Sequence, residues 1–323
     1  MLNKLFLTVF TLLLSSTLFS NDALTNYRLN GINEIEKKMD LGLTDESYWK
    51  EYLVNIDTSF GYIESYRNIL ACDKSNSSLT LYTRDSNNSY KITKEYAAYT
   101  GEKEGDKATE GDLKTPIGIY ALVKKISKLD SFYGPMAFVT SYPNTYDKYR
   151  NKEGHGIWIH GLPTEQERDE FTKGCIAINN QDIKCLNNNI DINKTILIIA
   201  NNSISNNISK DKLSFLLSSL YKWRYAWLYS DIDSYLDFYS QDFKRFDGMN
   251  LQNFVNYKTR IFSKNEKKTI IFNEINIIPY PNTEDIYKIT FIETYHSNNF
   301  SFIGKKVLII KLANKKMEII TEK

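Results

Sequence analysis

One histidine and one cysteine are the residues of this 323-residue chain best placed to do chemistry. His160-Gly161 comes shortly before Thr172-Lys173-Gly174-Cys175. A cysteine attacks as its thiolate, and imidazole is the side chain best suited to take the thiol proton, so this pair predicts acyl transfer. The chain has three histidines, and both His155 and His160 lie close to Cys175. The alternative interpretation is a small buried thiol beside a hydrogen-bonded core histidine.

Three segments in a fixed order carry a resemblance to a known family. His160-Gly161 and Thr172-x-Gly174-Cys175 form the last of them. Thr115-Pro116-Ile117-Gly118-Ile119-Tyr120 comes first, and Tyr142-Pro143-Asn144 with Tyr146-Asp147 lies between. Over about residues 78 to 200 the chain resembles the L,D-transpeptidase catalytic domain, whose signature is His-Gly followed by Ser/Thr-x-Gly-Cys.

The resemblance implies a β-rich scaffold, a cell-wall peptide as substrate and no cofactor or metal. Cys175 would attack the carbonyl at the L-centre of diaminopimelate and expel the terminal D-alanine. His160 would take the thiol proton and later donate one to the leaving amine. By the same analogy the backbone carbonyl of Gly161 orients the ring, and the N–H groups of Gly174 and Cys175 face the oxyanion.

Five further residues are candidates around the oxyanion and the substrate: Thr172, Lys173, Tyr142, His155 and Trp158. Lys173 stands where many members of the family carry His or Ser. It either stabilises a thiolate or a substrate carboxylate, or it points into water. Trp158 alternates with His160 along an expected strand, so both are expected to face the cleft. Tyr142, with Tyr146 and Tyr149, lines a groove or packs as an ordinary aromatic.

Ala177 is a second departure from the family, in which Asn or Arg is usual at this position. Both departures bear on substrate and acceptor preference rather than on the nucleophile. Residues 163–171 hold five charged side chains between the expected base and nucleophile. They predict a solvated segment, with a lid over the substrate as the alternative.

The first twenty residues have the pattern of a secretory signal, with Lys4 before the apolar run Leu5 to Leu14 and small residues after it. They predict export to the periplasm, and a membrane anchor is the alternative. Without Lys4, 40 basic and 39 acidic side chains remain, and this balance argues against a nucleic-acid partner. Cys72 and Cys185 either form a disulfide or remain two separate thiols.

Apolar spacing divides the rest of the chain and predicts an α+β protein. Residues 21–77 are expected to be helical and to pack on the catalytic domain or to form a dimerisation arm. Residues 78–200 are expected to form the catalytic domain, and 201–209 a linker. In 210–323 two helices precede several strands, an order that resembles the nuclear-transport-factor-2-like fold. The tryptophans of its first helix are expected mainly in the core.

The fate of the acyl-enzyme decides the activity. The whole arrangement resembles the cell-shape-determining periplasmic L,D-carboxypeptidases of helical epsilonproteobacteria, which favours trimming of tetrapeptide stems to tripeptides. Crosslinking of two diaminopimelate residues by an L,D-transpeptidase is the first alternative. A non-catalytic protein that binds the cell wall is the second. In each case the expected partner is peptidoglycan, and the protein is expected to lie at the periphery of the wall.

Overall fold

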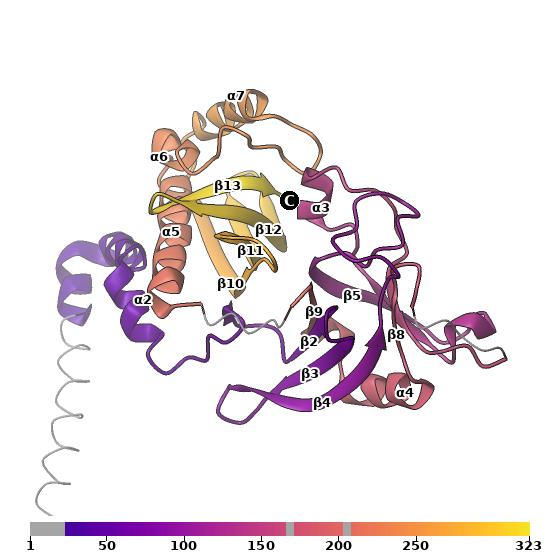
Figure 1. Ribbon diagram of the computed structural model, residues 1–323. Coiled ribbons are helices and arrows are strands. Elements are labelled where there is room, and N and C mark those ends of the chain that lie inside the picture. Colours follow the sequence, from indigo (N-terminus) through magenta and orange to yellow (C-terminus); the bar gives the residue numbers. More distant parts are fainter. Residues whose placement is uncertain (1–22, 166–170, 203–207) are drawn as a thin grey trace, which may run out of the picture.

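The computed structural model describes residues 23–165, 171–202 and 208–323 (Figure 1). The predicted signal, residues 1–20, lies outside these ranges, as do residues 166–170 of the predicted lid and 203–207 of the predicted linker. Helices at the start of the chain lead into a β-barrel, and a helix-covered sheet follows (Figure 1). Within the described ranges, no helix combines the length and apolar character needed to span a membrane.

The helical start of the chain is shorter than predicted. Residues 23–42 are helical, and α2 (Glu46–Tyr52) follows, with the side chain of Asp45 capping its first turn. The prediction that residues 21–77 are helical throughout is wrong, because β1 (Tyr62–Ile63) and β2 (Asn68–Asp73) lie in that range. All six residues of β2 are buried, and the strand pairs parallel to β9. A short apolar run of this kind carries no periodicity that separates strand from helix.

The barrel closes in the order β2-β3-β4-β8-β7-β6-β5-β9. Its remaining strands are β3 (Ser78–Arg84), β4 (Tyr90–Tyr99), β5 (Gly118–Ile126), β6 (Ala137–Thr140), β7 (Trp158–His160), β8 (Ile176–Ile178) and β9 (Thr195–Ala200). The strand expected to carry Trp158 and His160 is thereby confirmed as β7. Four short helical elements connect them: η1 (Ser131–Tyr133), α3 (Thr145–Tyr149), α4 (Asn180–Asn189) and η2 (Ile192–Lys194).

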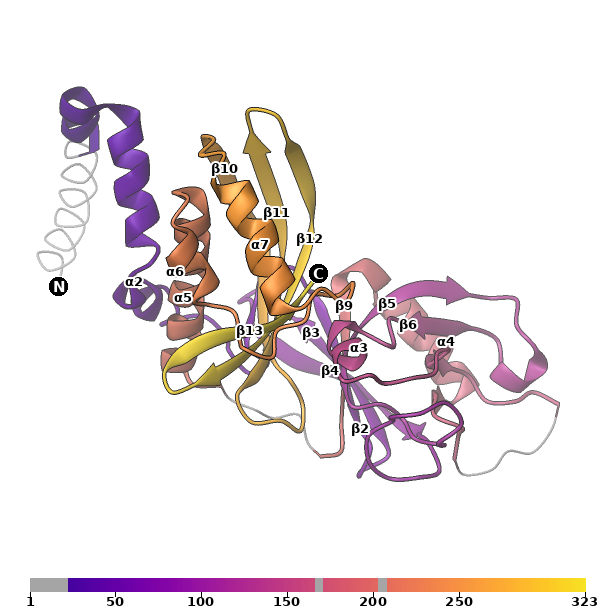
Figure 2. The same cartoon turned by 90° about the horizontal axis from the view of Figure 1, so that it is seen from above.

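The C-terminal domain is a sheet with helices packed on one face (Figures 1 and 2). The helices are α5 (Lys210–Leu228), α6 (Ile232–Leu236) and α7 (Leu251–Phe262), and the strands are β10 (Lys268–Pro279), β11 (Ile286–Ser297), β12 (Ser301–Ala313) and β13 (Lys316–Glu322). Trp223 is fully buried and stacks on Tyr235 at 5.5 Å, so the expected core role of this tryptophan is confirmed. The sequence analysis did not predict α7.

β1 and Tyr280 both contribute to the contact between the domains. β1, which precedes the barrel in the chain, adds to the edge of the C-terminal sheet beside β10. From the other side, Tyr280 enters the catalytic domain, where its ring packs on Tyr146 with centroids 4.7 Å apart. Its hydroxyl accepts a hydrogen bond of 3.0 Å from Nδ2 of Asn144. Because Asn144 also caps α3, the C-terminal domain contacts the start of this helix directly.

A buried carboxylate organises the segment that begins at α3. Asp147 has no exposed side-chain surface and lies 3.0 Å from Nη2 of Arg150 and 3.3 Å from Nζ of Lys152. Its other oxygen accepts the backbone N–H of Asn144 at 3.0 Å. Asp106 also pairs with both cations. The turn after α3 is therefore closed by ion pairs, and this turn leads towards β7.

Replacing Asp147 with alanine is expected to destabilise the protein by about 3–5 kcal/mol, because two cations would lose a buried partner. Urea denaturation followed by circular dichroism measures the free energy of unfolding. Glu95→Ala is the matched control, because Glu95 is exposed on β4 and is expected to change stability by less than about 0.5 kcal/mol. Equal effects of the two substitutions would contradict this account of the turn.

Candidate active site

The ring of the predicted base is held by its own neighbour. His160 ends β7 and is 2 % exposed, and its Nδ1 lies 2.7 Å from the carbonyl oxygen of Gly161. The contact implied by the family resemblance is therefore present. A carbonyl only accepts hydrogen bonds, so it selects the tautomer in which Nδ1 carries the proton. Nε2 is then left unprotonated and can accept a proton from a thiol.

Gly161 is the residue that allows this arrangement. A Cβ atom at this position would lie 2.3 Å from Oδ1 of Asn180 and 2.7 Å from Cδ of Pro135. The same Asn180 oxygen accepts the backbone N–H of Leu162 at 2.8 Å. The chain thus passes too close to its neighbours for any side chain at position 161. The His-Gly pair of the sequence reflects this close approach.

Cys175 lies immediately before β8 and is partly exposed. β7 and β8 are parallel neighbours, with Ile159 opposite Ile176 and His160 opposite Ala177. This register places Cys175 level with Trp158, one residue pair before Ile159 and Ile176. Because alternate side chains of paired strands share a face, Cys175 and His160 lie on the same face of the sheet. The pairing of base and nucleophile predicted from spacing is therefore compatible with the fold.

The segment before the cysteine is held by Thr172. Its hydroxyl oxygen accepts the N–H of Gly174 at 2.9 Å and donates to the carbonyl of Cys175 at 2.7 Å. Gly174 has φ +129°, and a Cβ there would lie 2.8 Å from the carbonyl oxygen of Lys114. The N–H of Gly174, which is expected to face the oxyanion, is directed at Thr172 in this structure, and its role toward the oxyanion stays a prediction. Thr172 is a positioning residue for the cysteine loop.

Tyr133 belongs to the site although the sequence analysis did not predict it. Its ring lies edge-on to His160 and also contacts Trp158, with centroid separations of 5.1 Å in both cases. Burial raises the pKa of the Tyr133 hydroxyl, and the charge of Cys175 raises it further. Tyr133 comes from η1, more than twenty residues before His160, and no motif marks it in the sequence.

The remaining residues that the sequence predicted for the site differ in how exposed they are and in what they contact. Trp158 is half-buried beside Tyr133, and Lys173 is exposed. His155 is also exposed, with Nδ1 3.7 Å from a carboxylate oxygen of Glu110. Tyr142 is 6 % exposed and its hydroxyl donates to the carbonyl of Glu153 at 2.7 Å. The structure places Tyr142 in the barrel core, which corrects the interpretation that it lines the groove.

The three cysteines are separate thiols, and the possible Cys72–Cys185 disulfide is not formed. Cys72 is fully buried in the barrel, where burial raises the pKa of its thiol to about 12. Cys185 belongs to α4, and its Sγ lies 3.5 Å from Nδ2 of Asn189. The Sγ of Cys175 lies 3.5 Å from the carbonyl oxygen of Gly156. Of the three, Cys175 is the cysteine that shares a face with a histidine.

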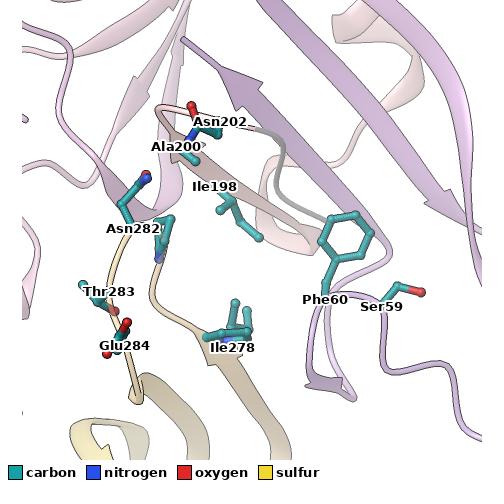
Figure 3. Close-up of a pocket in the computed structure, with 11 residues that line it drawn as sticks. Ser59, Phe60, Ile198, Ala200, Asn202, Ile278, Asn282, Thr283 and Glu284 are labelled. Carbon is teal, nitrogen blue, oxygen red and sulfur yellow. The ribbon is translucent and has the colours of Figure 1, made fainter. Parts of the chain in front are cut away.

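A cavity of about 350 Å³ lies away from these residues, between the barrel and the C-terminal sheet (Figure 3). Phe60, Ile198 and Ile278 form its apolar side, and Asn202 and Asn282 lie at its polar end. It contains no cysteine or histidine among the described residues that line it. Its lining therefore offers no thiol or imidazole for the predicted chemistry.

A closed barrel with a thiol and a buried, carbonyl-oriented histidine on one face defines a cysteine acyl-transfer domain. The family model of the L,D-transpeptidase catalytic domain, YkuD, matches residues 67–199. The model of the Cds6 C-terminal NTF2-like domain matches residues 215–323. The chain belongs to the L,D-transpeptidase family and carries a nuclear-transport-factor-2-like domain after the catalytic domain.

Two solved relatives cover nearly all of this architecture. The helical cell shape determining protein Pgp2 from Campylobacter jejuni is 38% identical, with a TM-score of 0.79 over 87% of this chain and 99% of that one. A point mutant of the same Pgp2 is 37% identical, with a TM-score of 0.80 over 88% and 99% of the two chains. Bd1075 from Bdellovibrio bacteriovorus is 29% identical, with a TM-score of 0.67 over 83% and 97%.

A curated relative matches a shorter stretch. YafK of Escherichia coli strain K12, whose name places it among the L,D-transpeptidases, is 38% identical over 95 residues. The match covers 29% of this chain and 33% of YafK, so the chain spans about a third of the length of that relative.

Replacing His160 with glutamine is expected to slow alkylation of Cys175 by iodoacetamide roughly tenfold at pH 7, because an unassisted thiol is only a few per cent thiolate there. Peptide mass spectrometry measures the rate at each cysteine separately. Cys185 is partly exposed and belongs to α4 rather than to the face of the histidine, so its rate is the internal control. An unchanged rate at Cys175 would show that His160 does not activate it.

Proposed function

We propose that the protein is an L,D-carboxypeptidase that removes the terminal D-alanine from tetrapeptide stems of peptidoglycan. The observation that carries the proposal is the parallel pairing of β7 and β8, which brings Cys175 to the face of His160. The contact between His160 and the carbonyl of Gly161 supports the tautomer that this chemistry needs. The helical cell shape determining protein Pgp2 has the same two-domain architecture, which supports an effect on cell shape.

In the proposed reaction, Sγ of Cys175 attacks the carbonyl carbon of the scissile amide while Nε2 of His160 takes the thiol proton. The carbonyl electron pair moves onto oxygen, where the N–H of Cys175 is the proposed donor. The intermediate collapses as the carbon–nitrogen bond breaks, and His160 donates its proton to the departing D-alanine amine. Water, deprotonated by His160, then cleaves the thioester and releases the tripeptide.

The rest of the site is proposed to orient the substrate. Trp158 and Tyr133 present aromatic surface beside the histidine, so they are suited to pack against the stem. Lys173 and His155 are exposed, and Lys173 lies two residues before Cys175 in the sequence. A substrate carboxylate is the group it would contact.

The place of action is proposed to be the periplasm, at the periphery of the cell wall. The pattern of residues 1–20, with a positive residue before an apolar run, supports export.

Crosslinking by attack of a second diaminopimelate amine on the same thioester is the alternative reaction. It uses the same Cys175 and His160, so only the products separate the two activities.

Incubation of a purified disaccharide-tetrapeptide with the mature protein is expected to give tripeptide and free D-alanine, measured by mass spectrometry. Cys175→Ala is expected to abolish both products, because the acyl-enzyme needs the thiol. Cys185→Ala is the matched control and is expected to retain activity. Crosslinked dimers would instead indicate the transpeptidase. Binding of unchanged substrate, unaffected by Cys175→Ala, would contradict an enzymatic role.

We further propose that the first helix forms a homodimer. Residues 23–42 present several exposed apolar side chains, namely Leu24, Tyr27, Leu29, Ile32 and Met39. The helix is fixed to the body of the protein at its end, where Asp40 lies 2.8 Å from Nη1 of Arg224 and 3.0 Å from the hydroxyl of Tyr229. An anchored helix with this much exposed apolar surface is suited to pack against a second copy.

Leu29→Glu/Ile32→Glu is expected to convert the dimer into a monomer, because the two carboxylates would have to be buried without partners. Light scattering coupled to size-exclusion chromatography measures the mass. Asn30→Glu/Asn33→Glu adds the same charge to the same helix at exposed polar positions and is expected to remain dimeric. A monomeric wild-type protein would exclude this role of the helix.

A further inference from the structure

We propose that a groove between the two domains binds a ligand that carries two or more carboxylate or phosphate groups. The groove has a volume of about 440 Å³. Its walls come from α3 of the catalytic domain, from β11, β12 and β13, and from the loop at residues 244–248. α3 contacts β12 and β13, and Figure 1 shows α3 beside the C-terminus. Cys175 and His160 do not line the groove, so it is a separate site.

The lining of the groove is strongly basic. Six cationic side chains contribute to it: Lys148, Lys244, Arg245, Lys288, Lys305 and Lys323. The one carboxylate side chain among the described lining residues is that of Asp247, and Nε of Arg245 already donates to it at 2.9 Å. The positive charges clearly outnumber the negative ones.

The lysines of the groove lack the ion pairs seen elsewhere in the protein. In the part of the chain that the structure describes, none of the five lies within 4.0 Å of a carboxylate oxygen of an acidic side chain. Lys152, by contrast, has two such partners behind α3. Cations gathered in one hollow without counter-charges repel one another, and an anion that enters the hollow relieves this repulsion.

Lys288 is the lysine of the groove whose charge its surroundings disfavour most. It projects from β11, and its Nζ donates to the carbonyl of Ile119 at 2.9 Å. Burial lowers the pKa of Lys288 to about 7, with Lys305 adding to the decrease and Asp147 opposing it. A bound anion would favour the charged form of Lys288, and the lysine would then take up a proton. Binding is therefore expected to weaken as the pH rises above 7.

The neutral part of the lining indicates an organic ligand rather than a bare ion. Val307, Pro143 and Phe246 give the groove apolar surface between the lysines. Carbon skeletons bury favourably on such surface, while their charged ends reach cations on either side. Lys148 comes from the catalytic domain and Lys244 from the C-terminal domain, so one ligand would contact both domains.

Titration calorimetry of the mature full chain with citrate and, separately, with inorganic pyrophosphate tests the proposal. At least one probe is expected to bind. Lys148→Gln/Lys244→Gln is expected to lower the affinity for that probe roughly tenfold, since each partly exposed ion pair contributes a few-fold in affinity. Both lysines are exposed, so the fold is expected to tolerate the change. Raising the salt concentration is expected to weaken binding as well.

Lys184→Gln/Lys222→Gln is the matched control, because it removes two exposed lysines outside the groove and changes the net charge equally. Binding of citrate alone would identify carboxylates as the ligand groups, and binding of pyrophosphate alone would identify phosphates. Failure of both probes to bind at millimolar concentration, or equal weakening in the control, would overturn the proposal. If the first double variant does not fold, Lys305→Gln provides the same comparison.

Discussion

The parallel pairing of β7 with β8 is the contact on which the rest of the site depends. Antiparallel neighbours follow one another through a short turn, whereas parallel neighbours need a crossover connection. Here that connection separates His160 from Cys175 in the sequence, and the pairing brings them back to one face. The small size of Gly161 and the hydrogen bonds of Thr172 then fix the two ends of the connection. His160 and Cys175 are thus held by backbone geometry more than by side-chain partners.

The C-terminal domain is part of the same framework. Tyr280 contacts Asn144 at the start of α3, and the segment from α3 continues to Gly156, whose carbonyl oxygen lies 3.5 Å from Sγ of Cys175. A ligand bound between the domains would touch α3 at its exposed side. The chain thus runs from α3, at the wall of the groove, to Gly156 beside Cys175.

Charge is distributed in two contrasting ways on either side of α3. Behind the helix, Asp147 and Asp106 neutralise Arg150 and Lys152, so buried cations are fully paired. In front of it, lysines face a hollow whose one acidic side chain is already paired with Arg245. The first arrangement stabilises the fold, because breaking it would leave buried charges alone. The second carries a repulsion that the fold tolerates, and tolerated repulsion of this kind is typical of binding sites.

The sequence alone predicted the pairing of His160 with Cys175 and the L,D-transpeptidase family, because His160-Gly161 and the loop to Cys175 reflect local backbone requirements that residue types record directly. Tertiary structure decided what depends on distant neighbours. β2 is a strand because β9 lies beside it, and Tyr133 reaches His160 from another part of the barrel. Likewise Tyr142 is buried by its surroundings, although its type fits a groove equally well. Short apolar runs and single aromatics have no periodicity that fixes their environment, so only the packed fold assigns it.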